Sequence, residues 1–528
     1  MNFKRIRNSR ILKKQTVSEA ALILIVLSLL SKIMGYLRTV LVAYYFGASA
    51  QVDAFVVAML IPAMVLGIIS GGMQAVIIPV YTEKKKEDVE KARLFVNQIF
   101  FINLILLGFL SLFMILFPTL FVKLVAYGFH EQRLSLAAYF LRYLVIFGFL
   151  NVFVGFFVGL LQSEKQFLFP AVTLLIGNSL IPASILLFAR RIGINSWTIG
   201  EISFGAFAFS VLFLFLFFEK KLFHAFQVFH IKWREILQFF ALLLPVFFTS
   251  GVNVIYQIVD KSVASSLPSG SVAALNFAQL IYRIPYGLLA VPIATSVYPT
   301  LSSLAAEKEY LKYTEVIKKT FSLLSFIALP ISLFFIVYSN VIVNLLYRHG
   351  AFTEHAASLT AFAVSMYSIG LIAFSLNFFF QRVFFSFKDT KTPLYITIFT
   401  VSLNAVGDVL LSKVWGVGGI GLATSISAIV SLFLYLLFIR KKRFVENFPY
   451  RFLVKEFLKL TIVLIVSLLT ALLFKPLFNK PMSLLLSLSI FSFVFVVFIG
   501  VVIFCAYFLK SYGLQILFTY IKGVFVKK

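Results

Sequence analysis

The chain has 528 residues, of which 61% are hydrophobic and only 13% are charged. A soluble domain is roughly 45–50% apolar and about 25% charged, so a water-soluble globule and a disordered chain are both excluded. The net charge of +27 would indicate nucleic-acid binding in a soluble protein, but lysine and arginine also collect in the cytoplasmic loops of membrane proteins. The composition therefore predicts a polytopic membrane protein with no nucleic-acid partner.

Apolar stretches of about 20 residues recur along the whole chain, as membrane-spanning helices require. They do not alternate polar and apolar residues as the strands of an outer-membrane barrel do. The sequence therefore predicts an all-α fold of about 14 transmembrane helices. In chain order the expected spans are 18–45, 53–81, 92–118, 134–161, 167–189, 196–219, 236–262, 271–303, 315–346, 356–385, 393–412, 417–439, 454–474 and 483–509.

Charge fixes the expected orientation. The basic segment 1–17 precedes an apolar run that is too long for a signal peptide, so we expect a cytoplasmic N-terminus and a retained first helix. With this orientation most lysines and arginines fall on the cytoplasmic side, above all in 84–93, 220–234, 308–319 and 440–455. An even number of spans then places both termini in the cytoplasm.

The basic loops also divide the chain. Six spans precede the loop 220–234 and six more precede 440–455, which predicts two parallel six-helix lobes related by a pseudo-twofold axis along the membrane normal. We therefore expect an N-lobe at 18–222 and a C-lobe at 223–445. Two further helices and a cytoplasmic tail follow at 446–528.

Enzyme motifs are absent from the sequence. It contains no Walker A, HExxH or GxSxG motif and no GxGxxG motif after a strand, and Cys505 has no second cysteine to pair with. We therefore expect no enzymatic activity. Paired six-helix lobes favour a transporter that works by alternating access over a channel.

Charged and amide side chains inside the spans are candidates for substrate binding, because such groups are costly in a bilayer. We expect a cationic cavity that can hold a phosphate group, since guanidinium makes bidentate contacts with phosphate. The alternatives are that Lys32 snorkels to the interface and that Arg38 only pairs with Asp53. The candidates are Lys32, Arg38, Asp53, Gln279 and Arg283.

A second set of polar residues is rich in oxygen. Asn404 and Asp408 are four residues apart and share a helical face, and Asp260 and Thr424 can supply further oxygens. Such a set suits a small hard cation. The alternative is that one carboxylate pairs with Lys261 or Lys413 and the other is hydrated.

Proline and glycine occur at corresponding places in the second and eighth spans, and bends there point to a gate. The alternative is that these are ordinary packing kinks. The candidate hinge residues are Pro62, Gly71, Gly72, Pro285 and Gly287.

Several short stretches resemble the MurJ (MviN) family, the lipid II flippases of the MOP exporter superfamily. They lie in order along 18–440, and the two extra C-terminal helices fit the same family. The stretches are SKIMGYLR at 31–38, FGA at 46–48, DAF at 53–55, PYG at 285–287, RHGAFT at 348–353, DTKTP at 389–393 and ATS at 423–425.

The resemblance implies a flippase that moves lipid II from the inner to the outer leaflet of the bacterial inner membrane. It implies that Arg38, Lys32 and Asp53 take part in substrate binding and that the last two helices line a groove for the polyprenyl tail. It also implies a sodium ion as a coupling or structural ion, and a role beside the cell-wall synthesis machinery. The sodium ligands would be Asp260, Asn404, Asp408, Thr424 and the carbonyl of Ile420.

The chain departs from the family pattern at two places where arginine is usual, namely Leu66-Gly67 with Gly71, and Gln279-Leu280. A flippase for another polyprenyl-diphosphate-linked oligosaccharide is therefore the first alternative. A cation-coupled drug antiporter and a cell-wall scaffold are alternatives of other classes. The antiporter would want an acidic cavity, which Arg38 and Lys32 oppose.

Overall fold

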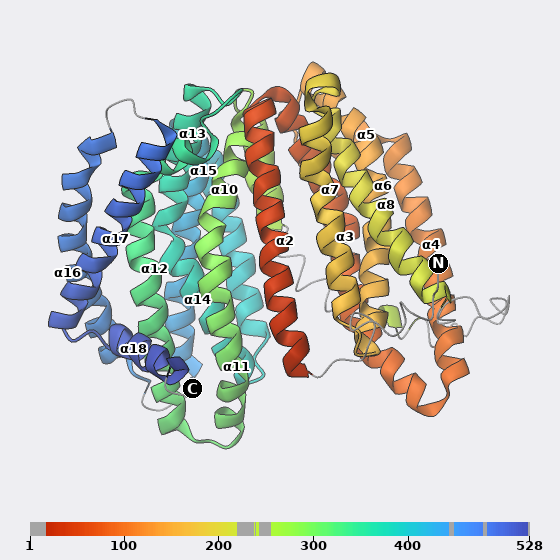
Figure 1. Cartoon of the computed structure of the whole chain (residues 1–528). Coiled ribbons are helices and arrows are strands. Elements are labelled where there is room, and N and C mark those ends of the chain that lie inside the picture. The colour runs from red at the N-terminus through yellow and green to blue at the C-terminus, as the bar shows by residue number, and fades with distance from the viewer. Residues whose placement is uncertain are drawn as a thin grey trace. The chain divides into compact units, whose positions relative to one another are not determined.

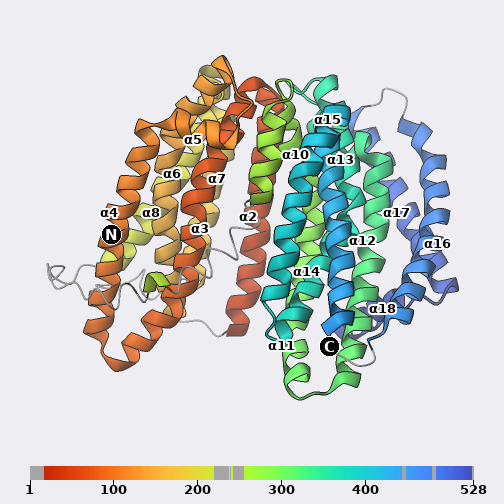
Figure 2. The same ribbon diagram turned by 180° about the vertical axis from the view of Figure 1, so that it is seen from behind.

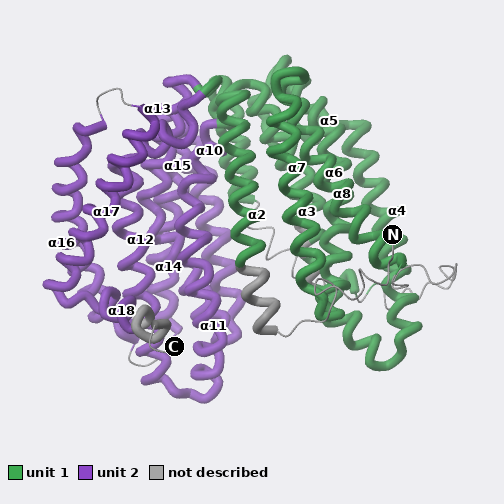
Figure 3. Tube along the Cα trace, viewed as in Figure 1, with its two compact units in different colours: residues 1–273, 350–352 green, residues 274–349, 353–528 purple. Residues whose placement is uncertain are grey.

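The computed structural model describes residues 17–218, 237, 239–241, 255–442, 448–478 and 483–525. Within these ranges the secondary structure is helical, with no strand. Most of the basic segment 1–17 and the predicted loop 220–234 lie outside them. The chain forms two compact units: unit 1 is 1–273 with 350–352, and unit 2 is 274–349 with 353–528 (Figure 3).

Unit 1 is a helical bundle built around two long helices that pack together, α3 (Ala50–Glu87) and α6 (Glu131–Ser163) (Figure 1). Its core is rich in phenylalanine. The rings of Phe100 and Phe153 pack edge to face, with their centroids 5.1 Å apart. Such ring pairs are favoured because the positive edge of one ring meets the negative face of the other. The other helices of the unit are α2 (Val17–Phe46), α4 (Val89–Leu116), α5 (Pro118–Val125), α7 (Leu168–Ile192) and α8 (Asn195–Phe218).

Unit 2 is a second bundle in which α12 (Tyr310–Tyr347) packs against α13 (Glu354–Ile369) and α16 (Tyr450–Phe474) (Figures 1 and 2). Tyr338 of α12 is fully buried and donates a hydrogen bond to the carbonyl of Ala471 in α16 at 2.6 Å. The remaining elements are α10 (Ser271–Pro285), η2 (Tyr286–Ala290), α11 (Val291–Ala306), α14 (Leu371–Ser386), α15 (Lys391–Lys442), η3 (Lys475–Phe478), α17 (Leu484–Phe508) and α18 (Tyr512–Phe525).

The described helices confirm an all-α membrane fold. Eleven of them are long and apolar enough to cross a membrane, or 12 if the pair α13 and α14, bent by 44°, forms one span. The predicted span 236–262 lies largely outside the described residues. The predicted spans 393–412 and 417–439 are merged in α15, whose backbone reverses at Gly416, where φ is 53° and ψ is −131°. Glycine adopts this conformation without the steric cost that a Cβ atom would add.

The division into compact units falls after Ala273. The physical reason is a set of contacts that tie the segment before α10 to unit 1. The Ser265 hydroxyl accepts a hydrogen bond from Gly128 N at 3.0 Å, and Arg133 donates to the Leu267 carbonyl at 3.2 Å. The two-lobe repeat itself stays a prediction.

Two short helices were not expected from hydropathy, α5 and α18. In unit 2, α18 is fastened by Glu456 of α16, whose buried carboxylate accepts hydrogen bonds from Ser511 Oγ and Tyr512 N, both at 2.7 Å. The Tyr512 hydroxyl donates to Glu315 of α12. Burial together with this bond to a carboxylate raises the pKa of Tyr512 to about 12. The start of α18 is therefore held against α12 and α16.

Candidate functional site

The site residues of unit 1 centre on an ion pair between α2 and α8. Arg38 donates from Nη1 to Glu201 Oε1 at 3.0 Å, and the Glu201 side chain is only 1% exposed. The same carboxylate oxygen accepts a hydrogen bond from Trp197 Nε1 at 2.9 Å. The Trp197 ring in turn stacks on Phe55 of α3, with centroids 3.8 Å apart. Three helices of unit 1 thus hold one arginine in place.

Glu201 is the residue that the sequence reasoning missed. The alternative interpretation paired Arg38 with Asp53, but the structure pairs Arg38 with a residue 163 positions further along the chain. The available signal was Glu201 itself, a lone acid in an apolar stretch of 24 residues that is now α8. A carboxylate in such a stretch needs a partner, because an isolated buried charge is very costly.

Asp53 lies in the first turn of α3 and is fully buried. Its carboxylate accepts hydrogen bonds from Gly270 N and Ala273 N, both at 2.7 Å, at the start of α10. Arg133 Nη1 lies 3.8 Å from the same carboxylate. A carboxylate at a helix N-terminus satisfies backbone N–H groups that lack an intrahelical partner. Asp53 thus anchors the start of α10, and its role in substrate binding stays a prediction.

The remaining substrate-binding candidates are spread over both units. Lys32 of α2 is exposed in unit 1. Gln279 of α10 is buried in unit 2, where it donates from Nε2 to the Tyr367 hydroxyl of α13 at 3.0 Å. The guanidinium of Arg283 lies over the Tyr282 ring at 5.9 Å. Arg283 is half-buried and follows the buried Gln279 by four residues on α10.

Four of the five predicted cation ligands lie together in unit 2, on the two arms of α15. Asn404 Nδ2 donates to Asp408 Oδ1 at 3.1 Å and to Thr424 Oγ1 at 3.2 Å. Thr424 Oγ1 donates to the Ile420 carbonyl at 3.0 Å. All four residues are buried. The fifth residue, Asp260, is buried in unit 1.

The chemistry of this α15 cluster fits a small hard cation. Its groups offer carboxylate, amide, hydroxyl and carbonyl oxygens, which are the ligands such ions prefer. The amide oxygen of Asn404 is buried and accepts no hydrogen bond from the residues that the structure describes. A buried acceptor of this kind is costly unless something satisfies it, and a cation does so.

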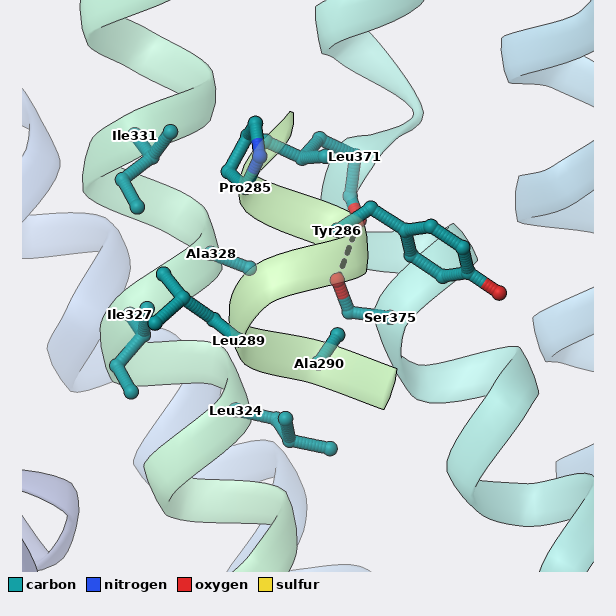
Figure 4. A pocket seen from close by; sticks show the side chains of 10 residues that line it. All are labelled: Pro285, Tyr286, Leu289, Ala290, Leu324, Ile327, Ala328, Ile331, Leu371 and Ser375. Carbon is teal, nitrogen blue, oxygen red and sulfur yellow. Dashed lines mark hydrogen bonds between the residues drawn. The ribbon is translucent and has the colours of Figure 1, made fainter. Parts of the chain in front are cut away.

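The predicted hinge in the eighth span coincides with a change of helix type. After Pro285 the chain makes five residues of π-helix, η2, before α11 begins. Beside this turn lies a small cavity of about 10 Å³, shown with its lining side chains in Figure 4. π-Helical turns are rare and are frequently found at functional sites. The distortion lies where the sequence suggested it, and its role as a gate stays a prediction.

The hinge candidates of the second span lie in a continuous helix, α3, that packs closely on α6. A Cβ atom on Gly148 would come within 2.6 Å of Pro62 Cβ, and one on Gly155 within 2.2 Å of Ser70 Oγ. Gly71 and Gly72 follow directly after this contact. Pro62 therefore packs into a notch of α6, and any bending there stays a prediction.

Comparison with known proteins identifies the family. The chain matches the family model described as "Lipid II flippase MurJ" over residues 42–507. It is 29% identical over 427 residues to a probable lipid II flippase MurJ of Borreliella burgdorferi, and the aligned region covers 80% of this chain and 83% of the relative. It is 30% identical over 414 residues to a probable lipid II flippase MurJ of Aquifex aeolicus, with 77% and 80% covered.

Solved structures agree. A lipid II flippase MurJ in an inward closed conformation matches with a TM-score of 0.74 at 25% identity, over 91% of this chain and 98% of that one. An inward-facing MATE transporter of the MOP superfamily matches with a TM-score of 0.66 at 16% identity, over 78% of this chain and 94% of that one. The second likeness shows the fold alone.

Flippases are transporters and not enzymes, and the many apolar helices indicate a multi-pass protein of the inner membrane. The family match begins inside α2 and continues to within one residue of the end of α17, well over half of the chain. The chain therefore belongs to the MurJ family of lipid II flippases.

Proposed function

We propose that this chain moves lipid II from the inner to the outer leaflet of the bacterial inner membrane by alternating access. The observation that carries the proposal is the extent of the family match, which includes both helices beyond the predicted lobes, α16 and α17. The MATE structure, by contrast, covers only 78% of the chain. A drug antiporter therefore accounts for less of the molecule than a flippase does.

The proposed role of Arg38 is to bind the diphosphate of the substrate. The Arg38 side chain is 28% exposed while its partner Glu201 is buried. An arginine held by a carboxylate on one side still has N–H donors for a second anion, because guanidinium carries five. Phosphate oxygens are the anions that such a planar fork suits best.

We also propose that sodium binds at the α15 cluster of unit 2, and Asp260 stays a ligand predicted from the sequence alone. Asn404, Asp408, Thr424 and the Ile420 carbonyl would hold the ion through oxygen atoms. A bound cation would offset the charge of the buried Asp408. It would favour one access state only if its affinity differs between the states.

The direct test uses the whole chain in two assays. In a strain depleted of its own lipid II flippase, expression of this chain should restore growth. In liposomes, the purified chain should move lipid II and not a polyprenyl diphosphate that carries another oligosaccharide. Transport of the second lipid alone would favour the alternative substrate, which the missing arginines near Gly67 and Gln279 make the first to try. Failure with both lipids would contradict the proposal.

A further inference from the structure

Unit 2 contains a large open cavity apart from the residues considered so far. Its volume is about 870 Å³, and residues of α12, the end of α15 and the start of α16 line it. This volume is within the usual range of about 300–1,000 Å³ for ligand pockets. The cavity is therefore large enough for part of a lipid.

The cavity is positively charged. Among the described residues that line it, Lys318, Arg440 and Arg451 are basic and none is acidic. Lys318 Nζ lies 3.6 Å from Glu315, so part of its charge is compensated. Arg440 and Arg451 are exposed, and neither forms an ion pair within the described part of the chain. Two guanidinium groups are thus available to an anion.

The rest of the lining is largely apolar and aromatic. The rings of Phe448 and Tyr450 lie 4.6 Å apart, and the Tyr450 hydroxyl donates to the Leu436 carbonyl at 3.2 Å. Phe433 lies in the last part of α15 and is 63% exposed. Aromatic rings next to arginines are typical of the level of the lipid headgroups.

We propose that this cavity binds an anionic membrane phospholipid. Arg440 and Arg451 hold its phosphodiester, and its acyl chains follow the exposed apolar side of α15 at Phe433. Basic pockets between transmembrane helices on the cytoplasmic side are suited to such headgroups. The occupant is a diacyl lipid and not a soluble phosphate, because the cavity joins cations to aromatic and lipid-facing side chains. The inference does not depend on the substrate that the chain transports.

The test measures lipid binding to the full chain in detergent, after its co-purified lipid has been removed. Phosphatidylglycerol is titrated by native mass spectrometry beside phosphatidylcholine with the same acyl chains. The variant is Arg440→Gln/Arg451→Gln. The matched control is Arg190→Gln/Arg191→Gln, two exposed arginines in the last turn of α7 in unit 1.

Each guanidinium near a lipid surface should contribute roughly fivefold in affinity, so the variant should bind phosphatidylglycerol about 25-fold more weakly. The control should bind as the wild type does, and Arg440→Lys/Arg451→Lys should retain most of the affinity. Equal loss of affinity in variant and control, or equal binding of phosphatidylcholine by the wild type, would overturn the proposal.

Two further arms separate the sources of the anion. Glycerol phosphate that competes as strongly as phosphatidylglycerol would show a soluble-anion site and would overturn the lipid assignment. Lipid II that binds to the wild type but not to Arg440→Gln/Arg451→Gln, while phosphatidylglycerol binds equally to both, would assign the cavity to the substrate instead. The melting temperature of each variant should equal that of the control, which shows that the fold is retained.

Discussion

Arg38 and Glu201 show how far single residues can be interpreted before the structure is known. The spacing of polar residues placed Arg38 inside a span and gave it a function, because an intramembrane charge is costly. Its partner could not be found in this way, since α2 and α8 are far apart in sequence and only the packing of unit 1 brings them together. The local pattern thus identified the charge but not what balances it.

This pair gives a prediction that separates stability from transport. Arg38→Gln leaves the buried Glu201 without its counter-charge, and breaking such a pair costs about 3–5 kcal/mol. Arg38→Gln/Glu201→Gln removes both charges and should recover most of that loss, as measured by thermal unfolding in detergent. If Arg38 binds the diphosphate, the stable double variant should still fail to move lipid II in liposomes.

The matched control for that experiment is Arg190→Gln/Arg191→Gln, which also removes guanidinium charge but at the exposed end of α7. It should transport as the wild type does. Arg38→Lys should keep only part of the activity, because an ammonium group loses the bidentate fork. Wild-type transport by the double variant would reduce Arg38 to a structural residue.

Asp389 gives a prediction about pH. Burial of its carboxyl group alone would raise the pKa of Asp389, but hydrogen bonds from Lys442 and from the backbone and hydroxyl of Thr392 outweigh this and lower the pKa. A lowered pKa means that the ionised form stabilises the fold. The contribution of the ionised carboxylate to the free energy of unfolding is complete above the ordinary aspartate pKa of about 3.9. It is lost as the pH falls through the lower pKa of the folded state.

Asp389→Asn keeps an oxygen that can accept from Thr392 N but loses the charge that pairs with Lys442, so it should lower the free energy of unfolding at pH 7 by up to about 1 kcal/mol, the upper value for a part-exposed ion pair. The difference from wild type should shrink as the pH falls from 5 to 3. Thermal unfolding at a series of pH values measures it, with the exposed Ser402→Ala on the same helix as control. A difference that does not depend on pH would show that Asp389 acts without its charge.

At the scale of elements, hydropathy predicts the membrane-spanning helices well because each must bury about 20 apolar residues in lipid. The ends of α6, α7, α8 and α17 fall within a few residues of the expected spans. The π-helical turn after Pro285 and the docked helix α18 could not be predicted in this way. Both depend on tertiary contacts, such as the carboxylate of Glu456 at the start of α18.

The hairpin of α15 is the element that should respond to sodium. Its two arms bring Asn404 and Asp408 beside Thr424. We expect sodium, compared with choline at equal ionic strength, to raise the melting temperature of the purified chain, because an ion that binds only the folded state stabilises it. Asp408→Ala should abolish this difference.

Ser402→Ala provides the control, since Ser402 is exposed on the same arm of α15. It should keep the full response to sodium. Asp260→Ala tests the predicted ligand in unit 1 and should weaken the response. If Asp260→Ala and Asp408→Ala both respond to sodium as the wild type does, any bound ion lies elsewhere.

At the scale of the whole molecule, charge and hydropathy carry different information. Hydropathy gives the number of spans, while the distribution of lysine and arginine gives their orientation. The all-α fold and the family were predicted correctly from these patterns and from short stretches of sequence. The division into two six-helix lobes stays a prediction. The anchoring of the segment before α10 to Asp53 could not be predicted, because it depends on backbone contacts that leave no periodic signal.

The orientation itself is testable with single cysteines. Because Cys505 is the only cysteine in the sequence, Cys505→Ser provides a background without thiols. Lys86 and Ser269 are both exposed and lie at the end of α3 and just before α10. The positive-inside rule places the triple-lysine segment 84–86 in the cytoplasm and Ser269 outside.

In intact cells a membrane-impermeant maleimide should therefore label Ser269→Cys and leave Lys86→Cys unlabelled. Both positions should react once the cells are permeabilised, which shows that each thiol is accessible. Labelling of position 86 from outside intact cells would reverse the orientation, and with it the predicted cytoplasmic location of both termini.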